Sequence, residues 1–396
     1  MSEIVYRFYG LLHRAAKSLI GKRRLPSPAR RGRCIRIGVP KEKAPNHWRG
    51  FVEGSLIKTP DFNGFHFAGY IADCMEWCLP SWIWTNAASV RMYCSIGEIQ
   101  KARLLCDRLI AYQQGCGGWI VRNDYDSIGA IPVLAPNDSA YIANNAVLSV
   151  YEATREKEYL DVAIKCANWI IETARPDGIL HTGYNVRDGK WETDNVIVDI
   201  GFAAGLFAHL TELTGDDRYR LFLERFVARY IELFYIKEKD GFCTSVDKNN
   251  NRQGGMFARG QAWALEGLIP AYNLIQTAEL RYVIDRTVRN LIRQQNRNGG
   301  WAYNLTRKLM GEDCKAVSVI AKDLMDWFAQ TGDEQIRDSA EKAYDWCCAH
   351  TAFEGPGRGG IFSYCTEGAI VKDLYTSCAF VYASAYAIEL EKQLKR

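Results

Sequence analysis

The sequence predicts an all-helical fold, an (α/α)6 toroid in which six helical hairpins form a single barrel domain. Three observations predict it: an internal repeat with a period of about 60 residues, two alternating kinds of helix within each repeat, and no β-rich run between the repeats. In each repeat a helix poor in charged residues precedes a charged, amphipathic one. A helix that is apolar on all sides is buried, whereas an amphipathic helix has one face in water, so the alternation indicates an inner ring of helices inside an outer ring.

The charge-poor inner helices are expected to begin near six positions, Pro80, Asp138, Asp199, Gly260, Asp313 and Asp373. Outer helices with apolar residues at three- and four-residue spacing are expected over 158–174, 217–234, 279–295 and 334–348. Gly215 and Gly332, each followed by acidic residues, mark two turns between an inner helix and its outer partner. We expect the last inner helix to pair with a helix from residues 50–78.

The linkers at the other end of the hairpins are rich in glycine and aromatic residues: Gly117-Gly118-Trp119, Asp240-Gly241-Phe242, Gly299-Gly300-Trp301 and Gly359-Gly360-Ile361. They join an outer helix to the next inner helix, so they are expected to line the mouth where the inner helices begin. The aromatic ring after the glycines can close the barrel end or contact a ligand. Trp119 and Trp301 are therefore candidate ligand contacts as well as candidate structural residues. Segments containing Gln114 to Trp119 and Gln295 to Trp301 loosely resemble the Gln-Trp repeats of terpene cyclases, but no Asp-rich catalytic motif accompanies them.

Composition leaves two interpretations of the aromatic content open. Aromatic residues make up 12% of the chain, with 11 Trp and 21 Tyr, which is typical either of a large helical core or of a cleft where rings stack on pyranoses. The 13 Cys are scattered, mostly on apolar helical stripes, as in proteins with reduced, buried thiols. Cys74 and Cys78 have no second pair at zinc-ligand spacing, so we predict no metal site and no cofactor.

Charge is distributed unevenly along the chain. Residues 1–50 hold 13 Lys or Arg and 2 Glu, although the whole chain carries only +4. We expect residues 1–49 to form a basic amphipathic segment and residues 50–396 the barrel domain. The segment 1–36 either lies on an anionic membrane surface or is a solvated arm. No nucleic-acid module, signal peptide or transmembrane stretch is recognisable, so we expect a cytoplasmic protein, with possible peripheral contact at the inner membrane face.

Two carboxylates stand at equivalent positions of neighbouring repeats, Asp138 after Asn137, and Asp199 between Val198 and Ile200. An N-cap is the simplest role for either, since Asp accepts amide hydrogen bonds at a helix start. The helices concerned are inner ones, however, so their first turns converge on one mouth. A carboxylate pair in a partly apolar cleft can split its pKa values and act as acid and base. Asp199 is expected in the more apolar setting.

The segment Phe257-Ala258-Arg259-Gly260-Gln261-Ala262-Trp263 is the most specific signal. Arg259 and Trp263 are four residues apart and so share a helix face. A cation at a helix start is unfavourable, and in a nearly charge-free helix this indicates that Arg259 meets a carboxylate, either of the protein or of a ligand. Trp263 is placed to stack on a sugar ring.

On these motifs the chain resembles the unsaturated glucuronyl hydrolases and the related rhamnogalacturonyl hydrolases, over roughly residues 80–345. The resemblance implies the (α/α)6 fold, no metal, and hydration of the C4=C5 bond of an unsaturated uronic acid in an oligosaccharide. By it, Asp199 would be the general acid/base and Asp138 its helper. The candidate substrate contacts are Arg259, Gln261, Trp263, Asn137, His181, Trp119 and Trp301.

The chain departs from the family's pattern in three places. Asn137 stands where the family favours His, Ile200 where it favours Asn, and no His follows Asp240-Gly241. Two alternatives to the hydrolase therefore stay open. One is a membrane-peripheral enzyme or accessory protein of surface-polysaccharide synthesis, similar to uronyl epimerases, which would explain the basic segment. The other is a non-catalytic, sugar-binding toroid.

Overall fold

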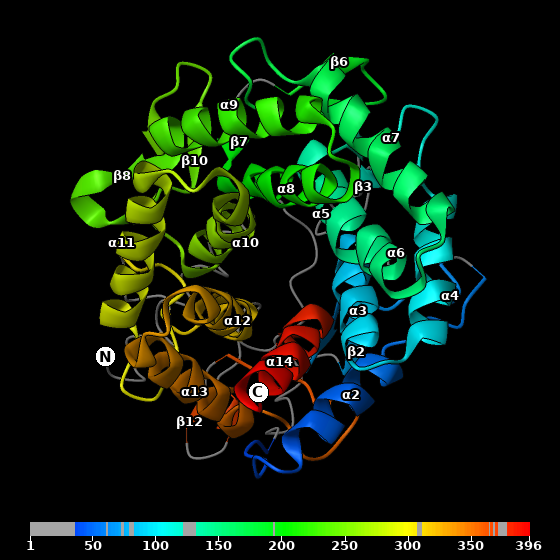
Figure 1. The fold of residues 1–396 in the computed structure, drawn as a ribbon. Helices are drawn as coiled ribbons and strands as arrows, with labels where there is room; N and C mark the ends of the chain where they lie inside the picture. The colour runs from blue at the N-terminus through cyan, green and yellow to red at the C-terminus, as the bar shows by residue number, and fades with distance from the viewer. Residues whose placement is uncertain are drawn as a thin grey trace, which may run out of the picture.

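The computed structural model describes residues 36–60, 62–72, 75–78, 83–121, 132–192, 195–306, 311–363, 365–366, 369–370 and 378–396. Over these residues the chain forms two concentric rings of helices, which Figure 1 shows along their common axis. The predicted (α/α)6 toroid is confirmed.

The inner ring consists of α3 (Ile83–Ser95), α5 (Pro136–Ile142), η2 (Ala143–Leu148) and α6 (Ser149–Thr154), α8 (Phe202–Thr214), α10 (Ala258–Ile275), α12 (Cys314–Thr331) and α14 (Val381–Leu394). The outer ring consists of α4 (Ile99–Ala111), α7 (Lys157–Thr173), α9 (Asp217–Phe234), α11 (Ala278–Gln294), α13 (Glu334–Ala349) and α2 (Ala44–Gly54). The predicted starts near Pro80 and Asp373 lie outside the described residues. The second inner helix continues through η2, a stretch of π-helix, a feature that often occurs near functional sites.

Burial follows the predicted division between the rings. Along α8 and α14 most side chains are buried, whereas the outer α9 and α11 bury one face and expose the other. The turn after α8 uses Gly215 in the left-handed region, at φ +67°, and that after α12 uses Gly332, at φ +65°. Sequence periodicity could predict these hairpins because burial on all sides, or on one side, leaves a direct imprint on residue type.

The ring closes differently from the expectation. The outer partner of α14 is α2, which begins at Ala44, and the described residues between 55 and 78 form turns and short strands rather than a helix. The expected domain boundary at residue 50 therefore falls inside α2, where Trp48 and Phe51 are fully buried. Residues 1–35 lie outside the described residues, and membrane binding by segment 1–36 stays a prediction. Among the helices that the structure describes, none is both long enough and apolar enough to cross a bilayer.

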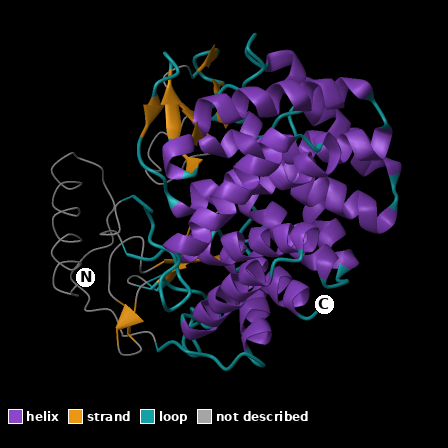
Figure 2. Cartoon of the chain, turned by 60° about the vertical axis from the view of Figure 1, so that its left-hand side comes forward, coloured by secondary structure: helices purple, strands orange, loops and turns teal. Residues whose placement is uncertain are grey.

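Short strands gather at one end of the helical body (Figure 2). They are β1 (Gly69–Ile71), β2 (Glu76–Cys78), β3 (Ile120–Val121), β4 (Val133–Leu134), β5 (Tyr184–Asn185), β6 (Lys190–Trp191), β7 (Asn195–Ile197), β8 (Tyr235–Ile236), β9 (Gly241–Phe242), β10 (Ser245–Asp247), β11 (Arg252–Gln253), β12 (Cys365–Thr366), β13 (Ala369–Ile370) and β14 (Cys378–Phe380). The sheet β3-β4-β5-β6 and the sheet β11-β10-β7 come from the linkers before the second to fourth inner helices. Strands of two or three residues carry no readable alternation, so the sequence did not predict them.

The glycines of the linkers are required by close backbone packing. Gly117 and Gly299 have φ of +112° and +95°, in the region that favours glycine. A Cβ at Gly117 would lie 2.5 Å from the Lys165 carbonyl oxygen, and one at Gly299 would lie 2.0 Å from that of Lys342. The linker is therefore pressed against the next outer helix in both repeats.

The tryptophans of the same linkers are structural, which corrects their candidate role as sugar contacts. Trp119 and Trp301 are both fully buried. Their indole N–H groups donate to the carbonyl oxygens of Leu109 and Leu291, at 2.7 and 2.8 Å. Each ring thus fills the barrel end and ties the linker to the preceding outer helix.

Candidate active site

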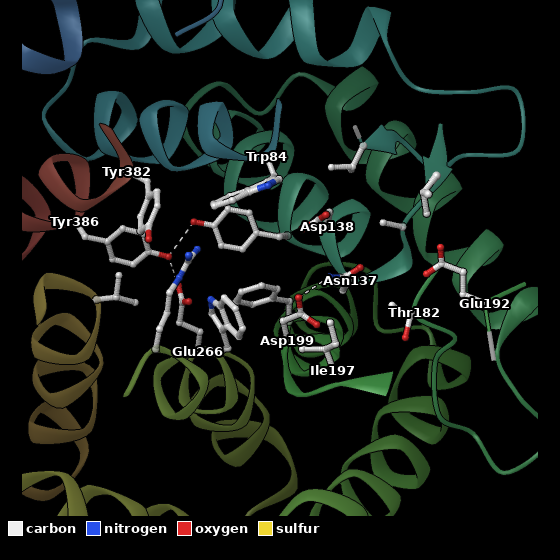
Figure 3. A pocket seen from close by; sticks show the side chains of 18 residues that line it. Trp84, Asn137, Asp138, Thr182, Glu192, Ile197, Asp199, Glu266, Tyr382 and Tyr386 are labelled. Carbon is white, nitrogen blue, oxygen red and sulfur yellow. Dashed lines mark hydrogen bonds between the residues drawn. The ribbon is translucent and has the colours of Figure 1, made fainter. Parts of the chain in front are cut away.

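A pocket of about 290 Å³ opens inside the inner ring, at the end where the short strands lie. Figure 3 shows the side chains that line it, which come from all six inner helices and from the sheets at the mouth. The lining residues are Trp84, Val121, Val133, Ala135, Asn137, Asp138, Tyr141, Thr182, Glu192, Ile197, Asp199, Phe202, Arg259, Trp263, Glu266, Val319, Tyr382 and Tyr386. The pocket therefore collects the two predicted carboxylates and the predicted guanidinium at one place.

Asp138 enters the pocket from the first turn of α5. The helix starts there because Pro136 occupies its first turn, where a missing N–H costs nothing. Burial and then the negative charge of Asp199 raise the pKa of Asp138 from 3.8 to about 8, against the opposing charge of Arg259. Asp138 is therefore a protonated, neutral acid at pH 7.

Asp199 lies on the short 3-10 turn η3 (Val198–Gly201), which leads from β7 into α8. Its Oδ2 accepts a hydrogen bond of 2.8 Å from the Asn137 side-chain amide. Burial raises the pKa of Asp199 to about 6, less than that of Asp138, because Asn137, Arg259 and backbone amides stabilise the carboxylate. The expectation that Asp199 occupies the more apolar setting is thus corrected: the larger shift belongs to Asp138.

Arg259 is the second residue of α10 and is enclosed by aromatic rings. Its guanidinium carbon lies 4.4 Å from the ring centre of Tyr382, 4.7 Å from that of Trp263 and 5.2 Å from that of Trp84. Such contacts favour a cation over the ring face. Within the described part of the chain no carboxylate lies within 4.0 Å of the guanidinium, and its Nε, which is buried, has no hydrogen-bond partner. Arg259 is therefore held in place without being neutralised.

The floor of the pocket is a buried polar network that the sequence reasoning missed. The Tyr141 and Tyr386 hydroxyls lie 2.9 Å apart, and Tyr386 also donates to Glu266 (Figure 3). Glu266 lies 3.7 Å from Arg91. Arg91 donates from Nε and Nη2 to the two carboxylate oxygens of Glu389. The signal was present, since Glu266 is a lone acid in a charge-poor inner helix, as Arg259 is a lone base there. Where the chain is described, no three His, Cys, Asp or Glu side chains come together so as to hold a metal ion.

Solved structures of carbohydrate-active proteins resemble this architecture at low sequence identity. Unsaturated glucuronyl hydrolase from Bacillus sp. GL1 superposes with a TM-score of 0.69 at 15% identity, covering 90% of this chain and 97% of that one. A family 76 mannosidase from Bacteroides thetaiotaomicron gives 0.67 at 12%, covering 89% and 97%. A sugar epimerase from a ruminal bacterium gives 0.70 at 13%, covering 89% and 97%. No protein-family model and no curated protein sequence matches the chain.

The fold is that of the unsaturated glucuronyl hydrolases. The same toroid serves a mannosidase and an epimerase, so the reaction has to be argued from the pocket. Of the residues predicted from the resemblance to unsaturated glucuronyl hydrolases, Asp138, Asp199, Arg259, Trp263 and Asn137 all line this pocket.

Gln261 is placed elsewhere, which corrects its candidate role as a substrate contact. Its side chain is fully buried behind α10, where the amide accepts from the Phe242 N–H at 2.7 Å and donates to the Phe242 carbonyl at 2.9 Å. Both ends of the amide are occupied by the backbone of β9. Gln261 therefore connects the linker between α9 and α10 to α10 itself.

His181 does not line the pocket. Its ring stacks on Trp191, with the ring centres 4.7 Å apart, and burial lowers its pKa. The stack supports the sheet β3-β4-β5-β6 on which neighbouring pocket residues stand, so the structure offers no support for a direct sugar contact by His181.

Proposed function

We propose that this protein is a hydrolase of oligosaccharides that end in a 4,5-unsaturated uronic acid, and that it acts by hydrating the C4=C5 bond. The observation that carries the proposal is the guanidinium of Arg259, which is enclosed by aromatic rings and has no carboxylate within 4.0 Å among the described residues. The same pocket holds two carboxyl groups with raised pKa values. The fold shared with unsaturated glucuronyl hydrolases supports the same class of enzyme.

Arg259 supplies the carboxylate-binding site. A guanidinium pairs with a carboxylate through two parallel N–H···O bonds, and the low local dielectric of a pocket strengthens that pairing. Trp84, Trp263 and Tyr382 fix the orientation of the fork and offer flat apolar faces to a sugar ring. The pocket thus selects a ring that carries a carboxylate.

Asp199 is the general acid and base. With a pKa of about 6 it holds a proton in an appreciable fraction of molecules near neutrality, and it can take one back. In the proposed reaction the Asp199 carboxyl gives its proton to C4, and the π electrons of C4=C5 form the new C–H bond. The ring oxygen stabilises the positive charge that develops at C5. Water then bonds to C5 and returns a proton to the Asp199 carboxylate.

The product of this step is a hemiketal at C5. Its C5–O bond to the ring oxygen breaks as C5 becomes a ketone, and the freed oxygen on C1 becomes a hydroxyl. C1 is then a hemiacetal, which expels the second sugar as its alcohol. No glycosidic oxygen has to be protonated in the first step, so one acid/base residue is enough.

Asp138 acts as the neutral partner. Because its pKa is about 8, it stays protonated while Asp199 exchanges its proton, so the pocket never holds two adjacent negative charges beside a uronate. A protonated carboxyl can also donate a hydrogen bond to the substrate, which an ionised one cannot.

An unsaturated uronyl disaccharide tests the proposal directly, because hydration removes the conjugated enol ether and its ultraviolet absorbance. The wild-type protein is expected to remove the absorbance with release of the second sugar, and Asp199→Asn to lose at least ~100-fold in turnover, within the range that acid–base groups contribute. Asp161→Asn, on the exposed face of α7, is the matched control. Binding without loss of absorbance by the wild type would overturn the hydrolase in favour of a sugar-binding toroid.

A further inference from the structure

Glu192 stands on the outer wall of the same pocket, on the side opposite Tyr386 (Figure 3). It follows β6 directly and is exposed to solvent at the mouth. Neither the proposed acid/base chemistry nor the binding of the uronate uses it. An oligosaccharide that extends from the pocket toward solvent would pass this carboxylate.

The position of Glu192 is fixed by its sheet. Its N–H donates to the Gly183 carbonyl at 2.7 Å, next to the pair formed by Tyr184 and Trp191 in β5 and β6. A Cβ at Gly183 would lie 2.3 Å from a methyl group of Val133 and 3.7 Å from Oε2 of Glu192. The glycine therefore lets the β5 strand pack closely against Val133 of β4, and this packing places the backbone of Glu192 at the mouth.

The outer wall offers hydrogen-bond acceptors. Glu192 has no cation within 4.0 Å among the described residues, so none of these residues forms an ion pair with it. The Thr182 hydroxyl beside it donates its proton to the Asn195 carbonyl, which leaves only oxygen lone pairs to face the pocket. The inner end, in contrast, holds the guanidinium of Arg259, which has no carboxylate within 4.0 Å among the described residues. The two ends of the pocket thus present different groups, a guanidinium at the inner end and the Glu192 carboxylate on the outer wall.

We propose that Glu192 determines the identity of the second sugar, which is a neutral or amine-bearing residue without a sulfate or carboxylate group. This inference rests on the proposed function, because the uronate must occupy the Arg259 end for the second sugar to face Glu192. Hydroxyl and ammonium groups donate to a carboxylate and a threonine oxygen. A sulfate or carboxylate group on the second sugar brings only acceptors and a like charge, and repulsion between like charges costs free energy.

Two unsaturated disaccharides that differ only in one O-sulfate on the second sugar provide the test. We expect the wild type to favour the unsulfated compound at least ~5-fold, both in kcat/KM and in affinity measured by calorimetry, the scale of one like-charge contact near a protein surface. Glu192→Gln keeps the shape and removes the charge, so it should bring that ratio close to one. Glu224→Gln, on the exposed face of α9, should leave the ratio unchanged.

The outcomes separate the two proposals. Binding of both compounds without turnover would overturn the proposed hydrolysis, and the affinity ratio would still decide the role of Glu192. A wild-type preference for the sulfated compound, or the same ratio in Glu192→Gln, would overturn the role of Glu192 and leave the hydrolase intact. Failure of the protein to bind either compound would overturn both.

Discussion

The Asn137 amide donates a hydrogen bond of 2.8 Å to Oδ2 of Asp199, and so links the first turn of the second inner helix to that of the third. Asn137 precedes Asp138, which means that neighbouring residues of one turn act on both carboxyl groups. The donor stabilises the ionised form of Asp199 and holds its pKa near 6, below that of Asp138. This hydrogen bond, together with backbone hydrogen bonds to Asp199, lowers the pKa of Asp199, whereas the charge of Asp199 raises that of Asp138.

Removing that donor should move the pH profile upward. Asn137→Ala leaves Asp199 without its main stabilising hydrogen bond, so its pKa rises further and the acid form persists to higher pH. The alkaline limb of kcat/KM should shift upward by about one pH unit, since a hydrogen bond to a charged group is worth ~1.5 kcal/mol and one pKa unit corresponds to 1.36 kcal/mol. Asn46→Ala, on an exposed position of α2, is the control. A limb that stays in place or moves down would contradict the assignment of Asp199 as the acid.

Asp138 should lower the stability of the fold at neutral pH. Its pKa is about 8 in the folded chain and 3.8 as the ordinary value, so the folded state retains a proton that the unfolded state releases. Below about pH 4 the group is protonated in both states, and its contribution to the free energy of unfolding is fully retained. As the pH rises toward 8, only the unfolded state loses the proton, and this contribution is lost. Asp138→Asn should therefore unfold at a higher temperature than the wild type at pH 7.5, by more than ~1 kcal/mol in free energy, and show little difference at pH 4. Calorimetric melts of both proteins across this range measure it, and an equal difference at both pH values would refute the burial of this acid.

Arg259 should discriminate carboxylated from neutral ligands. Arg259→Lys keeps the charge but loses the planar fork and much of the contact with three rings. Its affinity for an unsaturated uronyl disaccharide should fall ~10- to 100-fold, the loss of one charge-assisted bidentate pair. Its affinity for the carboxyl-reduced analogue should change little. Calorimetric titration compares the two ligands, with Arg218→Lys on the exposed surface of α9 as the control. Equal loss for both ligands would mean that Arg259 only supports the fold.

The convergence of Asp138, Asp199 and Arg259 could be predicted from the sequence because it follows from the repeat. Each stands at the start of a charge-poor helix, and the starts of the inner helices meet at one mouth. Glu192 and Thr182 reach the same pocket from two-residue strands and turns, whose positions depend on tertiary packing and leave no periodic signal. The difference in pKa between the two acids also depended on one hydrogen bond across two helices, which no local pattern contains.

The sequence misassigned three residues, Gln261, Trp119 and Trp301, as ligand contacts. Their residue types suit a sugar cleft and an interior equally well, and only the coordinates show that their polar atoms bind backbone carbonyls and amides. A repeat position that recurs with the same neighbours favours a structural role. Gln113 and Gln295 illustrate it, since each donates to the carbonyl of the glycine four residues on, Gly117 or Gly299, in its own linker. The Gln equivalent to Gln295 is thus Gln113, and not Gln114.

Substitution by alanine should destabilise the fold far more at the linker glycines than at the turn glycines. Both Gly299 and Gly332 have positive φ, at +95° and +65°, so a substitution strains the backbone at either. A Cβ at Gly299 would also lie 2.0 Å from the Lys342 carbonyl oxygen, whereas one at Gly332 meets nothing within 4 Å. Gly332→Ala should cost ~1 kcal/mol of unfolding free energy, the usual penalty for this backbone conformation. Gly299→Ala should cost at least ~3 kcal/mol, as the large losses caused by steric strain do. Urea unfolding measures both, and equal losses would show that the linker relaxes without resistance.

Arg91 should be the residue of the inner ring whose loss is costliest. Its guanidinium pairs with Glu389 at 2.8 Å and lies 3.7 Å from Glu266, and the carboxylate side chains are only 7% and 8% exposed. Arg91→Met would leave both buried carboxylates without their cation, a change that typically costs ~3–5 kcal/mol. Arg337→Met breaks the exposed pair with Glu341 on α13 and should cost under ~1 kcal/mol. Burial raises the pKa of Glu266, so this carboxyl would take up a proton once its cation is removed. The deficit of Arg91→Met should therefore shrink as the pH falls, and the deficit of Arg337→Met should not. Chemical unfolding at pH 8 and pH 5 compares the two variants, and a pH-independent loss in Arg91→Met would show that packing, and not charge, makes this site costly to disturb.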